Sequence, residues 1–146
     1  MTAPSTPRPQ PLSASLARLA SEERSGSARV GVAVAAIWQD IDARLSPVIG
    51  KQGVAALYQR SVALASRTHP WLADTHAGVA ATVDLAAIER VLGSQAPLVA
   101  AAGGGAVLDA FWEILSDMVG ESLTVELLGA VWAAAPEPSA RGEQHP

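Results

Sequence analysis

The 146-residue chain contains no cysteine, and aromatic residues make up 4% of it. Without cysteine there are no disulfides and no thiolate ligands or nucleophiles, which fits a reducing compartment such as the cytoplasm. The net charge of −4 provides no electrostatic basis for gripping phosphates, so nucleic-acid partners are disfavoured. No leader-like apolar run is seen near the N-terminus, and the apolar stretch at 97–108 is short and interrupted by glycine, so no membrane segment is expected.

Alanine is abundant and predicts helix. The chain has thirty alanines, about a fifth of its residues, and alanine loses no side-chain entropy in a helix. Proline and serine are concentrated at both ends, so residues 1–27 and 136–146 are expected to be solvated, disordered tails. Residues 28–135 carry nearly all the large apolar side chains and are expected to form a single helical domain.

Apolar residues recur at spacings of three and four in five segments, which predicts five helices. These segments lie at about 28–45, 53–67, 80–92, 107–119 and 122–135. Trp71 and Leu72 follow the helix-ending pair His69-Pro70 and are expected to plug the open end of a helix pair. Residues 94–105 could be helix or linker: Pro97 could begin a helix there, but three consecutive glycines favour a break, since each weakens a helix by roughly 1 kcal/mol. No segment alternates as a strand would, so the expected fold class is an all-α bundle.

Two segments, 45–65 and 115–135, are rough copies of one another seventy positions apart. In each, an apolar helical pattern meets a β-branched residue and a glycine, then resumes with a different phase. Gly50 and Gly120 are therefore predicted to be sharp corners, where each helix stops at a residue that tolerates the left-handed conformation. The bundle is expected to be built from two related corner units. Residues identical in the two segments are Leu45, Ser46, Gly50, Leu57, Ala63 and Ala65, matching Leu115, Ser116, Gly120, Leu127, Ala133 and Ala135.

The corner motifs PVIGKQGVAALYQRSVALA and DMVGESLTVELLGAVW carry a family resemblance. Over roughly residues 34–133 the chain resembles an uncharacterised group of small all-helical bacterial proteins. That group has paired I-G-x-x-G-x-x-A-L-x-x-R and I-G-x-x-L-T-x-x-L-L motifs. The resemblance implies a shared helical fold, and it implies no activity, substrate, cofactor or catalytic residue.

Histidines are the first candidates for chemistry. His76 could accept a phosphoryl group, as in helical phosphotransfer domains, but it lacks the lysine that usually follows such a histidine and is better explained as a loop residue. His69 could be an axial haem ligand in a pocket with Trp71 and Phe111, or could interact with the carbonyls at a helix C-terminus. His145 falls in the C-terminal tail and has no expected role.

Asp109, Glu113 and Asp117 form an acidic row with a spacing of four. No Glu-x-x-His pair accompanies the row, so a di-iron site is not predicted. The row is expected to be a solvated face, to pair with Arg60 and Arg67, which share a helix face, or to be a partner surface. Ser46, Ser61, Ser66 and Ser122 lack a nucleophile elbow, and the glycine-rich segment lacks a phosphate-loop motif. Trp38, Trp112 and Trp132 lie on apolar stripes and are expected in the core.

No catalytic constellation, metal site or cofactor is therefore predicted. The leading hypothesis is a non-enzymatic protein–protein interaction or regulatory module. It would bind a protein partner or a second copy, as a homodimer, through an exposed apolar helix face bordered by acidic residues. The alternative is a small-molecule or haem-type sensor with an apolar pocket between the corner units, near His69.

Overall fold

The computed structural model describes residues 11–21, 26–75 and 83–134, and within these the chain is an all-α bundle, as predicted. The α-helices are α1 (Leu12–Ala20), α2 (Gly26–Ala65), α3 (Leu85–Gly93), α4 (Pro97–Val119) and α5 (Glu121–Ala133). A 3-10 helix, η1 (Pro70–Thr75), follows α2. Gly50 divides α2 into a first arm, 26–49, and a second arm, 51–65.

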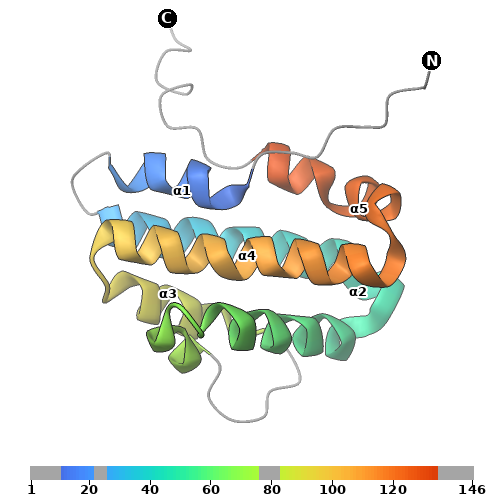
Figure 1. Cartoon of the computed structure of the whole chain (residues 1–146), viewed down its shortest axis with the longest axis horizontal. Coiled ribbons are helices and arrows are strands. Elements are labelled where there is room, and N and C mark those ends of the chain that lie inside the picture. The colour runs from blue at the N-terminus through green and yellow to red at the C-terminus, as the bar shows by residue number, and fades with distance from the viewer. Residues whose placement is uncertain (1–10, 22–25, 76–82, 135–146) are drawn as a thin grey trace, which may run out of the picture.

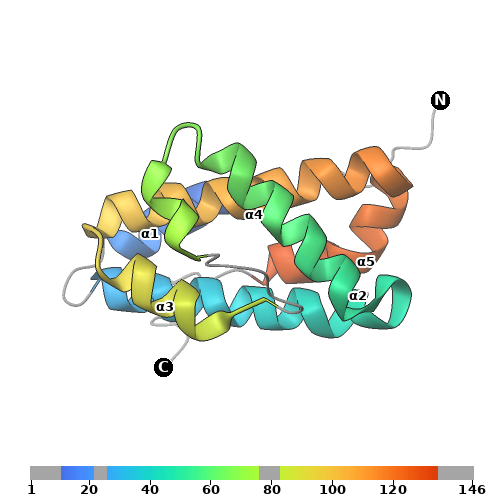
Figure 2. The same ribbon diagram turned by 90° about the horizontal axis from the view of Figure 1, so that it is seen from below.

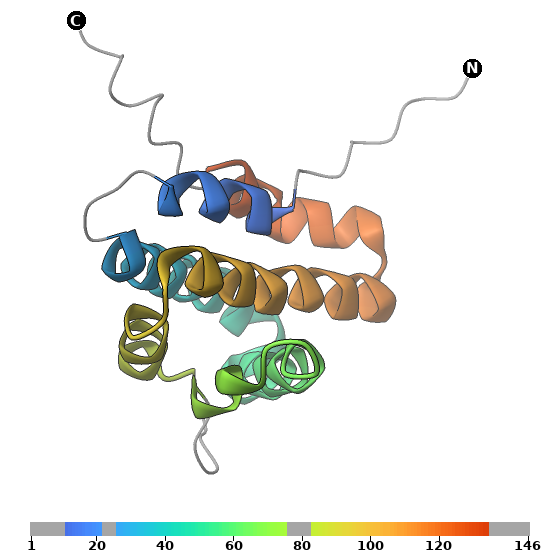
Figure 3. The ribbon, with the colours of Figure 1, turned by 60° about the vertical axis from the view of Figure 1, so that its left-hand side comes forward.

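The helices are arranged in three layers (Figures 1 and 3). The first arm of α2 and α4 form the middle layer. On one side of it lie α1 and α5, and on the other lie α3, η1 and the second arm of α2. Because α4 is covered from both sides, eleven of its residues are buried.

Both predicted corners are present. Gly50 has φ 83° and ψ 156°, and Gly120 has φ 97° and ψ 153°. The positive φ is as expected, but the extended ψ differs from the left-handed helical value that was predicted. This combination is essentially restricted to glycine, and it turns the chain sharply enough for the second helix of each unit to fold back. Both corners lie at the same end of the molecule (Figures 1 and 2), hereafter the corner end.

The two corner units bury equivalent positions. Ile41 and Leu45, before the first glycine, are buried, as are Phe111 and Leu115 before the second. Before the glycine, further buried pairs seventy positions apart are Val30/Ala100, Gly31/Ala101, Val34/Gly104, Ala35/Gly105, Ile37/Val107 and Trp38/Leu108. After the glycine, the helix buries the same face in both units, at Val54/Thr124, Tyr58/Leu128, Ser61/Val131 and Val62/Trp132.

The aromatic residues form the centre of the core, as predicted for the tryptophans. The ring of Trp38 is 4.8 Å from that of Tyr58 and 4.9 Å from that of Phe111, both edge to face. Trp112 and Trp132 join α4 to α5 with their ring centroids 5.0 Å apart. Edge-to-face pairs add to the stabilisation that burial alone supplies, so few aromatic residues hold together an alanine-rich interior.

The predicted break at 94–105 is wrong beyond Ala96, because α4 runs without interruption through Gly103, Gly104 and Gly105. A Cβ on Gly103 would lie 2.6 Å from Trp71 Cη2, and one on Gly104 would lie 2.9 Å from a Leu92 methyl carbon. On Gly105 it would lie 2.7 Å from Ser13 Cβ. The three glycines therefore allow three neighbours to approach the helix closely. The weak helix propensity is overridden by this tertiary packing.

The expected disordered tail at 1–27 is also wrong in part, because residues 12–20 form α1. Leu12 and Leu16 are fully buried and Leu19 is 4% exposed. Their spacing of four and three places them on one helix face. The helix is held by burial against α4, which local composition does not reveal. Residues 1–10 and 135–146 lie outside the described part of the chain, so the remaining tail predictions are not tested.

Several apolar residues of the predicted helices, although spaced as if on a buried face, are exposed to solvent. Leu123 is 39% and Met118 56% exposed, while Thr124 takes the buried position after the corner. Thr124 Oγ1 donates to the Gly120 carbonyl at 2.9 Å, which satisfies the hydroxyl within its own turn. In the second arm of α2, Ala65 is buried whereas Leu64 is 41% exposed. The apolar spacing predicts the buried face of each helix correctly, but it also includes residues at which no neighbouring helix packs.

By length and composition, α4 is apolar enough to cross a membrane: it has 23 residues and contains a long apolar stretch. The expectation that this stretch is too short and too broken is therefore wrong. In this structure 56% of that apolar stretch is buried inside the protein. A core helix covered on two sides has the same composition, so this feature is weak evidence for a membrane segment.

Replacing either corner glycine by alanine should destabilise the fold because of backbone strain alone. A Cβ on Gly50, Gly120 or Gly93 would meet nothing within 4 Å, but only the first two have positive φ. Gly50→Ala and Gly120→Ala should each lower the free energy of unfolding by about 1–3 kcal/mol. Gly93→Ala is the matched control and should not lower it. Urea unfolding measures all three, and equal stabilities would show that the corners are unstrained for alanine.

Gly105→Ala should also be destabilising, although alanine is the better helix former. The methyl group would meet the Ser13 backbone, and overpacking of this kind costs about 1–3 kcal/mol. Gly129 lies in α5, where a Cβ would meet only Val125 Cγ1, at 3.4 Å. Gly129→Ala should therefore raise stability by up to about 1 kcal/mol. Thermal and urea unfolding compare the two variants, and a stabilised Gly105→Ala would contradict the close approach of α1.

Candidate functional site

The corner end has an exposed apolar surface. Val48 and Met118 precede the two corner glycines by two residues each, and both are 56% exposed. Leu123, just after the second corner, is 39% exposed. Both corners lie at the same end of the molecule in two perpendicular views (Figures 1 and 2). Hereafter the corner surface means Val48, Met118 and Leu123.

Acidic side chains border the corner surface. Asp117 lies beside Met118, and Glu121 and Glu126 lie on α5 near Leu123; all three are exposed. Two basic residues lie near this end: Arg44, one turn before Val48, is exposed, and Lys51 donates to Asp42 Oδ2 at 2.6 Å. The second carboxylate oxygen of Asp42 accepts from Ser46 Oγ at 2.9 Å. These contacts link the helix before Gly50 to the first residue after it, and they engage the lysine with an acid of its own chain.

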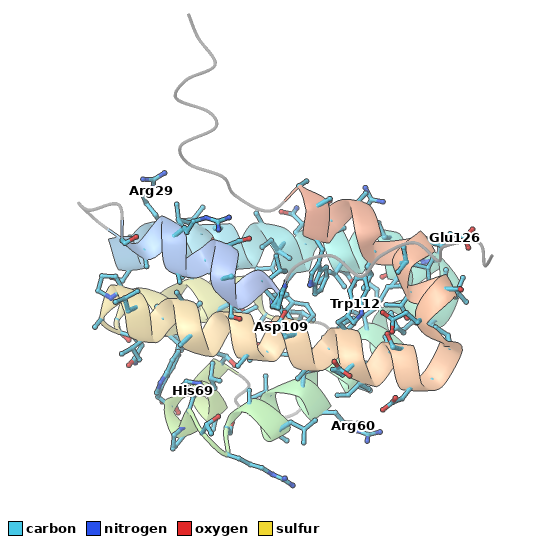
Figure 4. All side chains as sticks on the ribbon, turned by 45° about the horizontal axis from the view of Figure 1, so that its top comes forward. Arg29, Arg60, His69, Asp109, Trp112 and Glu126 are labelled. Carbon is cyan, nitrogen blue, oxygen red and sulfur yellow. The ribbon has the colours of Figure 1, made fainter. Side chains whose placement is uncertain are left out.

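The predicted acidic row does not act as one surface. Asp109 faces α1, where its carboxylate accepts from Leu12 N at 2.9 Å, Ser13 Oγ at 3.1 Å and Ser13 N at 3.4 Å. Figure 4 shows Asp109 between α1 and α4, with Arg60 on the other side of α4. The expected pairing of Asp109 with Arg60 is therefore wrong. Glu113, Asp117, Arg60 and Arg67 are exposed.

His69 lies at the C-terminus of α2, as its sequence position predicted. Its backbone N–H donates to the Ala65 carbonyl at 2.9 Å, and its ring is 6.3 Å from that of Trp71. The indole of Trp71 packs on Gly103, whereas Phe111 packs on Trp38. The three residues suggested for a flat cofactor are thus engaged in two separate contacts.

A small cavity of about 10 Å³ lies between α2, α3, α4 and η1. This volume matches roughly one water molecule and is far below that of a ligand pocket. Its lining is mostly apolar, with polar atoms from Tyr58 and Thr75. The Tyr58 hydroxyl donates to the Thr75 carbonyl at 3.5 Å, a long contact. His69 is not part of this lining.

Within residues 11–21, 26–75 and 83–134, no group of three or more His, Asp and Glu side chains is placed to hold a metal ion. His76 and His145 lie outside these ranges, so their predicted roles stay predictions. No family model, curated protein or solved structure matches the chain. The resemblance of the corner motifs to a bacterial group therefore also stays a prediction.

Sequence reasoning identified Asp109 but not its role, which is to accept three hydrogen bonds from α1. Its three partners belong to α1, 96 and 97 positions away in the chain, so no local spacing reports them. A signal for α1 itself was present. Leu12, Leu16 and Leu19 have helical spacing, but the prolines and serines around them favoured the interpretation as a tail.

Tyr58 provides a pH-dependent test of the core. Burial is the main cause that raises the pKa of Tyr58 from 10.0 to about 12. Below pH 10 the phenol is protonated in both states. Between pH 10 and 12 the unfolded chain loses the proton first, so the free energy of unfolding should fall, by about 3 kcal/mol in total.

Tyr58 is the chain's single tyrosine, so phenolate absorbance reports on it alone. The titration midpoint should lie near 12 in the native protein and near 10 in urea. Tyr58→Phe should flatten the alkaline loss of stability and cost at most about 1.5 kcal/mol at neutral pH. A native midpoint near 10 would show that Tyr58 is accessible to water.

Proposed function

We propose that this protein is a non-enzymatic interaction or regulatory module that binds a protein partner through the corner surface. The observation that carries the proposal is the equal exposure of Val48 and Met118, 56% each, at equivalent positions of the two corner units. Large apolar side chains have a solvation cost when exposed, and exposed apolar residues bordered by polar ones can mark a binding site.

The chemistry of the corner surface indicates the kind of partner. Methionine is flexible and polarisable, so Met118 can adapt to different apolar surfaces. The bordering carboxylates of Asp117, Glu121 and Glu126 favour a partner that places arginine or lysine around an apolar anchor. Lys51 would not repel such a partner strongly, because Asp42 offsets its charge.

The buried polar side chains of the described residues also support a binding role over a catalytic one. The buried polar side chains, Ser15, Ser61, Thr75 and Thr124, are mostly bonded to nearby backbone carbonyls. These contacts satisfy helix turns, and they do not prepare a nucleophile or a base. Reactions of the general acid–base kind need a titratable group aimed at a substrate site.

Replacing the apolar side chains of the corner surface by aspartate should abolish partner binding without unfolding the protein. The test variant is Val48→Asp/Met118→Asp. The matched control is Val32→Asp/Leu98→Asp, because Val32 and Leu98 are 56% and 60% exposed at the opposite end of the same two helices. Both variants should keep the wild-type melting temperature, since the changed side chains are solvated.

Quantitative pull-down should show at least a tenfold loss of specific partners for the corner variant and little loss for the control. Binding should also weaken as salt rises, because the expected partner is cationic. If both variants retain the partners, the proposal is wrong. If only the control loses them, the binding surface lies at the other end of the bundle.

A further inference from the structure

α1 packs on a helix distant from it in the chain. Its main neighbour is α4, with fewer contacts to α2, the helix that follows it. Figures 1 and 3 show α1 lying across the middle layer, in line with α5. Leu12, Leu16 and Leu19 are its buried anchors. Three anchors at spacings of four and three are how an amphipathic helix binds a receptor surface.

The receptor surface on α4 recognises the start of this helix. The residue before α1, Pro11, makes no side-chain cap, so the first backbone N–H groups of α1 have no partner in their own helix. The Asp109 carboxylate is their partner, and it accepts hydrogen bonds from the N–H groups of Leu12 and Ser13. One turn earlier on α4, Gly105 lets the Ser13 backbone approach. Hereafter the α1 site means this surface of α4.

The same arrangement occurs on the other long helix. α3 immediately precedes α4 but packs mainly on α2, where a Cβ on Gly31 would lie 3.0 Å from the Glu89 carbonyl oxygen. Both short helices have nine residues. Within one chain each short helix thus packs mainly on the long helix that it does not directly precede, next to a glycine.

We propose that the α1 site also accepts α1 from a second copy of this chain, giving a dimer by reciprocal exchange of α1. A second copy is the occupant because every copy brings the one helix shown to fit this site. Exchange would preserve the contacts of Asp109 and Gly105 and leave the α2–α5 body unchanged. The inference goes beyond the proposed function, and it places contact between copies of the chain away from the corner surface.

The chain's own α1 competes for the site with a high effective concentration, because it is tethered. The closed monomer should therefore dominate in dilute solution. Exchange should become visible when the intramolecular contact is blocked, or at high protein concentration.

Two complementary full-length variants test the proposal. Leu16→Asp damages the helix and keeps the site, while Gly105→Val keeps the helix and blocks the site. Each alone should sediment as a monomer of 15.0 kDa. Their mixture should form a 1:1 species of twice that mass, because an intact α1 then meets an intact site. The double variant Leu16→Asp/Gly105→Val, mixed with Leu16→Asp, is the matched control and should stay monomeric.

A mixture that stays monomeric while both variants show helical circular dichroism and cooperative melting would overturn the proposal. Should either variant fail to fold, a second measurement decides. Ala17→Cys introduces the chain's single thiol for a photo-crosslinker on α1. Concentrated ¹⁵N-labelled and unlabelled copies are mixed, warmed briefly and cross-linked.

Peptides that join labelled α1 to unlabelled α4 would support exchange, and joins within one isotope alone would contradict it. The Val48→Asp/Met118→Asp variant should behave as the wild type in this measurement. Failure of exchange therefore leaves partner binding at the corner surface standing, and loss of partner binding leaves exchange standing.

Discussion

The close approach of other elements to α4 is the constraint on which the rest of the structure depends. Three successive glycines on this helix allow four elements to approach it: Gly103 faces Trp71 of η1, Gly104 faces Leu92 of α3 and Val34 of α2, and Gly105 faces Ser13 of α1. A side chain at any of the three would force one neighbour away. Interiors are packed at crystal-like density, so such a shift would propagate through the core. Glycine is a poor helix former, but at these three positions only a residue without a side chain lets the neighbouring elements pack this closely.

The two corner glycines solve a different problem. A bundle of long helices needs sharp reversals of the chain. The φ and ψ values of Gly50 and Gly120 provide them, because at each glycine one helix ends and the next begins with no loop between them. Direct connection brings both corners to one end and leaves apolar residues beside them without cover. The corner surface is thus a consequence of the architecture. Its acidic border is a property of this particular sequence.

The arrangement of α1 and α3 links the fold to association. Each short helix packs mainly on the long helix that it does not directly precede, so these contacts hold the bundle together along with the central contact of α2 and α4. An element that already docks on a helix distant from it in the chain has the geometry to dock across chains. The two proposed interactions would therefore lie apart, partner binding at the corner surface and exchange of α1 along α4.

The sequence by itself determined the all-α class, the two glycine corners and the tryptophan core. Each of these is local, since it depends on apolar periodicity or on a conformation that one residue type tolerates. Tertiary structure decided the continuity of α4, the order of residues 12–20 and the role of Asp109. Each of those depends on a partner tens of residues away: Trp71 and Ser13 against the glycines, α4 beneath Leu12 and Leu16, and the N-terminus of α1 at a carboxylate. Local preference worth about 1 kcal/mol per residue predicted the opposite in the first case, and close packing outweighed it.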